Sequence, residues 1–144
     1  MSDALSFTQP LSVRRGRSGV IALWVVQIAL AGMFLLAGGS KLLGAPAMVA
    51  LFNTIGIGQW FRYVTGFIEV GAAIALLVPS IAVYGALALV PTMIGAVAAE
   101  LFIVGDSAVP PAVLLLGAVG VVWARRREFL SALPNARRSV DNVD

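Results

Sequence analysis

The stretch FRYVTGFIEVGAAIALLV, residues 61–78, decides the fold of this chain. It is apolar over nearly its whole length, and a helix of this length crosses the hydrocarbon core of a bilayer. A single acid, Glu69, lies inside it. A bare carboxylate in a spanning helix costs about 2.5–3.5 kcal/mol on insertion scales. Glu69 is therefore expected either to pair with a polar or cationic group or to have a functional role.

Three further apolar runs, at residues 19–39, 81–104 and 110–123, resemble this one in length and composition. Hydrophobic residues make up 60% of the 144-residue chain and charged residues only 12%, which is too little charge to cover the surface of a water-soluble domain. Only Pro79 and Ser80 separate the second run from the third, so these two helices are antiparallel neighbours. The sequence predicts an all-α polytopic membrane protein, an antiparallel bundle of four transmembrane helices.

A shorter element is expected between the first and second spans. Between Pro46 and Ile57, four apolar residues recur at helical spacing: Met48, Leu51, Phe52 and Ile55. This pattern predicts a short helix lying in the membrane interface. The whole chain then divides into a flexible cytoplasmic leader (1–18), a four-helix transmembrane domain (19–125) and a cytoplasmic tail (126–144).

Basic residues gather near the two ends of the chain, which predicts its orientation. Only Lys41 and Arg62 lie on the side opposite the termini. The other eight are Arg14, Arg15, Arg17, Arg125, Arg126, Arg127, Arg137 and Arg138. The positive-inside rule then places both termini in the cytoplasm. Because these residues flank apolar spans, the net charge of +3 indicates topology signals and lipid headgroup contacts rather than nucleic-acid binding.

The absence of cysteine and histidine excludes several chemistries from this chain. It supplies no disulfide, no axial haem histidine and no histidine-ligated metal. We therefore expect no metal site and no intrinsic cofactor. Any electron transfer would depend on a partner or on the chemistry of a bound ligand.

The predicted topology brings four charged residues into the outer half of the bundle. Lys41 and Arg62 lie at outer helix ends, Glu69 about 10 Å deep and Glu100 about 6 Å deep at 1.5 Å of rise per residue. Thr65 is four residues before Glu69, within hydrogen-bonding reach. Two interpretations stay open: structural ion pairs that fix helix order, or a polar pocket that opens toward the outer leaflet and binds a small head group or passes protons.

Three short segments resemble the DoxX-type membrane proteins in order and spacing. They are the end of the first span, residues 37–42 (AGGSKL), the second-span motif at residues 66–77 (GFIEVGAAIALL), and residues 95–102 (GAVAAELF) in the third span. The likeness covers about residues 19–125. It implies a four-helix protein of the bacterial inner membrane, with Lys41 and Glu69 at family positions.

The resemblance also carries expectations about function. Some members of the family resemble the membrane subunit of a thiosulfate:quinone oxidoreductase, and others associate with redox or detoxification proteins. Many relatives carry a histidine where Glu100 stands. A histidine-dependent ligand or proton step does not carry over, although a carboxylate can still accept a proton.

We therefore expect an accessory membrane subunit that binds a quinone or another lipid-like molecule for a redox or envelope system. The candidate ligand-binding residues are Lys41, Arg62, Thr65, Glu69, Thr92 and Glu100. The alternatives are a small membrane isomerase or cyclase with Glu69 or Glu100 as general acid or base, a proton-coupled transporter, and a purely structural scaffold. The expected partners are the lipid bilayer and further subunits, as a homo-oligomer or a larger membrane complex.

Overall fold

A computed structural model describes residues 17–132, all but a few of which lie in helices. The expected leader, apart from its last two residues, and the tail from residue 133 onward lie outside this part. The helices are α1 (Arg17–Leu42), α2 (Pro46–Ile55), α3 (Gln59–Leu77), α4 (Ala82–Ala99), a π-helical turn η1 (Glu100–Val104) and α5 (Val109–Ala132). The described residues form no strand. The all-helical prediction is confirmed, including the short helix between the first two long ones.

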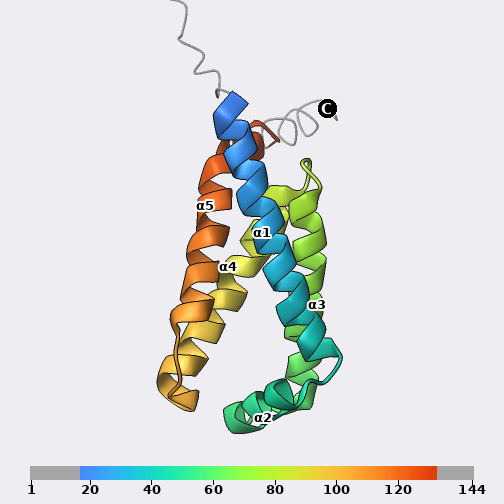
Figure 1. Cartoon of the computed structure of the whole chain (residues 1–144), viewed down its shortest axis with the longest axis vertical. Helices are drawn as coiled ribbons and strands as arrows, with labels where there is room; N and C mark the ends of the chain where they lie inside the picture. The colour runs from blue at the N-terminus through green and yellow to red at the C-terminus, as the bar shows by residue number, and fades with distance from the viewer. Residues whose placement is uncertain (1–16, 133–144) are drawn as a thin grey trace, which may run out of the picture.

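The four long helices form two pairs that diverge from each other (Figure 1). Helix α1 packs mainly against α3, and α4 packs against both α3 and α5. The start of α1 and the end of α5 lie at the same end of the molecule, while α2 lies at the opposite end. We refer to these two ends as the terminal half and the α2 half. The pairs converge in the terminal half and spread apart in the α2 half.

The terminal half contains the apolar core. Its members are Leu30, Ala31, Phe34, Ala72, Ala73, Leu76, Ala86, Leu89, Met93, Ala118 and Val121. Small residues allow the close approach of the helices: a Cβ added to Gly85 would lie 2.7 Å from the carbonyl oxygen of Ala72, and one on Gly117 would lie 2.7 Å from Cδ2 of Leu30. Backbones that approach this closely gain van der Waals contact, which is what holds helices together in lipid.

The outward surface of the bundle is apolar. Leu36, Phe67 and Phe102 expose 77%, 67% and 84% of their surfaces. Four helices, spanning Ser18–Leu42, Gln59–Leu77, Ala82–Val104 and Val109–Arg126, are long and apolar enough to cross a membrane. Side chains of this kind are stable facing acyl chains and unstable facing water. The chain is a multi-pass membrane protein, as the sequence predicts.

Helix α2 lies across the open end of the bundle, beneath the diverging pairs (Figure 1). It begins at Pro46, a residue that fits the first turn of a helix. It ends at Ile55 and is followed by Gly56, whose φ of +79° is a left-handed conformation that favours glycine. Gly44 and Gly58 also have positive φ. These turns let the chain leave α1, cross the end of the bundle and enter α3.

Candidate functional site

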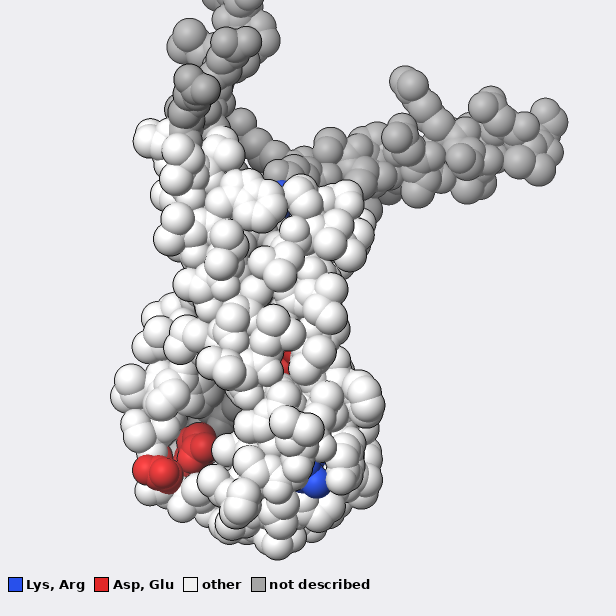
Figure 2. All heavy atoms as spheres, turned by 45° about the vertical axis from the view of Figure 1, so that its right-hand side comes forward, with Lys and Arg blue, Asp and Glu red and all other residues white. Residues whose placement is uncertain are grey.

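A cavity of about 950 Å³ occupies the space between the two helix pairs in the α2 half. Figure 2 shows the surface hollowed at this end, beside a group of acidic atoms. Every helix contributes to the lining. Its walls come from the end of α1, one face of α3 and most of α4, and it is closed at the end by η1, the start of α5 and the apolar face of α2. Most of these side chains are apolar, so the cavity suits a largely hydrocarbon molecule.

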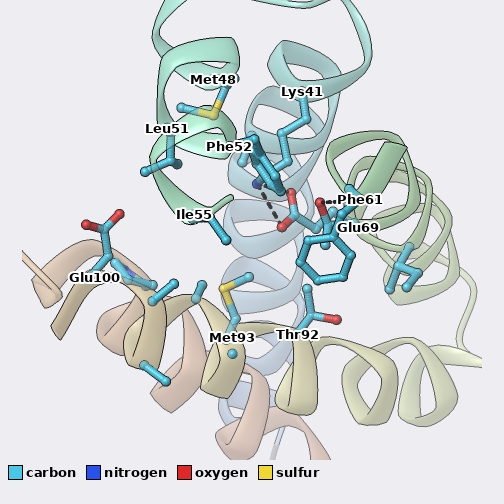
Figure 3. Close-up of a pocket in the computed structure, with 18 of the residues that line it drawn as sticks. Lys41, Met48, Leu51, Phe52, Ile55, Phe61, Glu69, Thr92, Met93 and Glu100 are labelled. Carbon is cyan, nitrogen blue, oxygen red and sulfur yellow. Dashed lines mark hydrogen bonds and ion pairs between the residues drawn. The ribbon is translucent and has the colours of Figure 1, made fainter. Parts of the chain in front are cut away.

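An ion pair between Lys41 and Glu69 forms one polar wall of the cavity (Figure 3). The Lys41 Nζ lies 2.8 Å from Oε1 and 2.7 Å from Oε2 of Glu69. The Glu69 side chain is 1% exposed and the Lys41 side chain 14% exposed. Both carboxylate oxygens are therefore bonded to the same ammonium group. Its attraction compensates part of the cost of removing the two charges from water, and a lone charge at this position would lose that compensation.

Glycines on α1 and α3 bring this pair together. A Cβ on Gly38 would lie 3.0 Å from both Cβ of Glu69 and the carbonyl oxygen of Gly66, and one on Gly66 would lie 2.9 Å from Leu42. Helices α1 and α3 therefore cross in near-backbone contact beside the ion pair. This packing fixes the rotation of both helices, which brings Lys41 at the end of α1 to the level of Glu69 on α3.

Two residues predicted to share this site have other partners. Arg62 donates through Nη1 to the carbonyl oxygen of Lys41 and through Nε to Oε1 of Gln59 (2.8 Å), and it does not line the cavity. The last carbonyls of a helix have no partner within the helix, and Arg62 lies beside those of α1. The Thr65 hydroxyl lines the cavity but donates to the carbonyls of Phe61 (3.2 Å) and Arg62 (3.1 Å), not to Glu69.

The opposite wall of the cavity carries Thr92 and Glu100. The Thr92 hydroxyl donates to the carbonyl oxygen of Ala88 at 3.0 Å, within its own helix. Glu100 begins the π-helical turn, which the sequence did not indicate. Its Oε2 is buried and has no hydrogen-bond partner among the described residues. Figure 3 shows Glu100 well apart from the Lys41–Glu69 pair, on the far side of the cavity.

The cavity also opens sideways, between α3 and α4. Among the lining residues on α3 and α4, five are themselves exposed: Val64, Ile68, Ala88, Pro91 and Gly95. The first two belong to α3 and the other three to α4, and the close contact between these helices at Gly85 and Ala72 lies in the terminal half. A Cβ on Gly95 would meet nothing within 4 Å. Since this side of the protein faces lipid, a molecule dissolved in the bilayer can reach the cavity without passing through water.

A second buried polar cluster, in the terminal half, was missed from the sequence. Gln27 Nε2 donates to the carbonyl oxygen of Leu76 (2.8 Å), and Arg125 donates to Oε1 of Gln27 (2.9 Å) and to the carbonyl oxygen of Pro79 (3.1 Å). Gln27 is 0% and Arg125 5% exposed. From the sequence alone, Arg125 indicates only a topology signal. Gln27, the lone glutamine of the first span, is the signal in the sequence that could have indicated this cluster, because a polar group in lipid requires a partner.

Of the six residues predicted to bind a ligand, the structure places five around one cavity: Lys41, Thr65, Glu69, Thr92 and Glu100. Within residues 17–132, no three acidic residues come close enough together to hold a metal ion. The polar groups that face the cavity are hydrogen-bonding groups. The site is therefore suited to binding an amphiphilic molecule with a small polar head.

A bundle of four membrane-spanning helices around an apolar cavity, with one buried ion pair at its wall, defines a small integral membrane protein with a ligand-sized chamber. Residues 25–124 match the model of the DoxX-like family. Because the match covers more than half of the chain, the protein belongs to the DoxX-like family. No curated protein and no solved structure matches the chain.

Proposed function

We propose that this protein is an accessory subunit of the bacterial cytoplasmic membrane that binds a quinone or a similar lipid-like molecule in the α2-half cavity. It would serve a redox or envelope system as part of a homo-oligomer or a larger membrane complex. The observation that carries the proposal is the cavity itself. Its volume of about 950 Å³ lies within the roughly 300–1,000 Å³ of small-molecule sites, and its lining is almost wholly apolar.

The Lys41–Glu69 pair supplies the polar contact for such a ligand. An ammonium group has three N–H donors, and Lys41 Nζ donates to both oxygens of Glu69. No described residue accepts the third donor, which leaves it for a ligand oxygen. A quinone carbonyl is an acceptor of this kind. Its isoprenoid tail would lie along the apolar wall and leave through the opening between α3 and α4.

Binding to the purified protein tests this proposal. Native mass spectrometry with decylubiquinone and a short-chain menaquinone should detect one molecule per chain. A double variant, Lys41→Met with Glu69→Leu, removes the polar contact without leaving a lone charge and should lose that binding. Gln27→Leu, which alters the other polar cluster, is the matched control and should keep it. Equal binding by the double variant, or no binding by the natural chain, would contradict the proposal.

The membrane isomerase or cyclase remains the competing function. Glu69 is bound through both oxygens to Lys41, so Glu100 is the acid with an oxygen available as a base. Incubation of the purified chain with each quinone analogue, with no partner present, separates the two functions. A new product would favour the enzyme, and recovery of unchanged ligand would favour the accessory subunit.

The proposed orientation has its own test. If both termini are cytoplasmic, the α2 half faces the outside of the cell. Since the chain contains no cysteine, a single cysteine reports its own location. Ser107→Cys, in the exposed turn before α5, should react with a membrane-impermeant maleimide in intact cells. Ser80→Cys, in the exposed turn between α3 and α4, should react only after the membrane is opened. The reverse pattern would overturn the orientation.

A further inference from the structure

The wall of the cavity opposite the ion pair is built on an unusual turn of backbone. Helix α4 changes at Glu100 into the π-helix Glu100–Val104, which ends at Gly105 with φ of +73° and a hydrogen bond from Gly105 N to Glu100 O (2.9 Å). Turns of this type are rare and frequently occur at functional sites. Here the turn begins at the acid that lines the cavity.

Glu100 differs from the other polar residues that line the cavity. The hydroxyls of Ser40, Thr65 and Thr92 donate to backbone carbonyls of their own helices. Lys41 and Glu69 bind each other. In the described part of the chain, only Glu100 keeps a buried side-chain oxygen in the cavity wall without a hydrogen bond. A carboxylate oxygen that is buried and unpaired is unfavourable, and a ligand donor would relieve it.

We propose that Glu100 accepts a hydrogen bond from a hydroxyl group of the bound ligand, so that the site selects a hydroxyl-bearing ring, the reduced quinol, over the oxidised quinone. The inference rests on the proposed function and specifies the ligand of the same cavity. Lys41 and Glu100 lie on opposite sides of the cavity (Figure 3). Lys41 would donate to one oxygen of the ring, and Glu100 would accept from the hydroxyl at the other side. The ring lies between the two helix pairs.

The chemistry of the two ligand forms explains the selection. A carboxylate only accepts hydrogen bonds. A quinol has two O–H donors and satisfies Glu100 with one of them, whereas both oxygens of a quinone are acceptors. A quinone carbonyl facing Glu100 would place two acceptors against each other and leave the carboxylate unpaired. Lys41, as a donor, binds an oxygen of either form, so it adds affinity without distinguishing them.

The test compares decylubiquinol with decylubiquinone on the full chain in lipid nanodiscs. A hydrogen bond to a charged acceptor changes binding by about tenfold or more, so we expect the natural chain to bind the quinol about tenfold more tightly. In Glu100→Gln the side-chain amide can also donate, and the difference should fall to within about twofold. Asp106→Asn alters an exposed acid outside the cavity and is the matched control. It should keep the full preference.

A second ligand pair separates the hydroxyl donor from the redox state. 4-Decylphenol and 4-decylanisole differ in that the hydroxyl hydrogen of the first is a methyl group in the second. The natural chain should prefer the phenol, and Glu100→Gln should not. A preference that survives in Glu100→Gln, or equal binding of both forms by the natural chain, overturns the role of Glu100 but leaves the proposed function standing. Absence of all binding to the natural chain overturns both.

Discussion

The two halves of this bundle bury polar groups in different ways. In the terminal half, Gln27 and Arg125 bond to each other and to backbone carbonyls, amid a closely packed apolar core. In the α2 half, Lys41 and Glu69 bond to each other beside a cavity, and Glu100 keeps an unpaired buried oxygen. The first arrangement joins helices, and the second leaves space and hydrogen-bonding capacity. The contrast places the close packing in the terminal half and the proposed ligand site in the α2 half.

The helix ends explain why the halves differ. The Pro79–Ser80 turn keeps α3 and α4 together in the terminal half, where Gly85 lies against Ala72. In the α2 half, the ten-residue helix α2 separates α1 from α3, and the turn after η1 leads into α5. Helix α2 closes the end of the bundle but does not fill its centre. The space between the pairs therefore stays open to a ligand.

The largest expected effect comes from breaking the ion pair of the α2 half. Glu69→Leu leaves the Lys41 ammonium largely buried with no counter-ion, which should lower the free energy of unfolding by about 3–5 kcal/mol. The double variant with Lys41→Met should recover most of this loss because neither charge is buried. Thermal unfolding in one detergent measures both. If the double variant is as unstable as Glu69→Leu, the ion pair itself stabilises the fold. That result would contradict the assignment of the stabilising contacts to the terminal half.

A smaller effect is expected from the polar cluster of the terminal half. Gln27→Leu removes a donor to Leu76 O and an acceptor from Arg125, so it should cost about 1–3 kcal/mol. The same unfolding measurement applies. Quinone binding should not change, because Gln27 lies outside the cavity. Loss of binding at unchanged stability would show that the two halves are coupled.

Replacing Arg62 tests whether this residue belongs to the proposed ligand-binding site. Arg62→Met keeps the length of the apolar stem but removes the bonds to the Lys41 carbonyl and to Gln59. We expect a loss of about 1–2 kcal/mol, because Arg62 is buried and its removal leaves the Lys41 carbonyl without this donor. Binding of decylubiquinone should stay within about twofold of the natural chain. A large loss of affinity for decylubiquinone with little loss of stability would show that Arg62 belongs to the ligand-binding site.

The smallest effect on stability and a large effect on binding are expected at Gly95. Gly95→Leu places a side chain in open space at the wall of the cavity and should narrow its sideways opening. Helix propensity alone should raise stability by up to about 1 kcal/mol, while decylubiquinone binding should fall. Gly120→Leu is the matched control, since its Cβ also meets nothing and Gly120 does not line the cavity. Equal binding by both variants would exclude access between α3 and α4.

Much of the site followed from the sequence once the topology was predicted. Lys41 and Glu69 were placed in one half of the bundle from helix direction and rise alone, and Glu100 in the same half. The bonding of Arg62 depends on the tertiary structure, because the carbonyls at the end of α1 compete for its guanidinium. The Thr65 hydroxyl lies within reach of Glu69 along the helix, yet it donates to carbonyls one turn back in its own helix, a common alternative for threonine.

The number, order and length of the spans follow from local properties of the chain. Each apolar run must satisfy its backbone hydrogen bonds internally in lipid, so it becomes a helix wherever its neighbours fall. The cavity, the π-helical turn at Glu100 and the burial of Arg125 depend instead on how far the helix pairs spread and how each helix is rotated. Those quantities are set by contacts between distant residues, such as Gly38 with Gly66 and Gly85 with Ala72. They exist only after the helices have packed together.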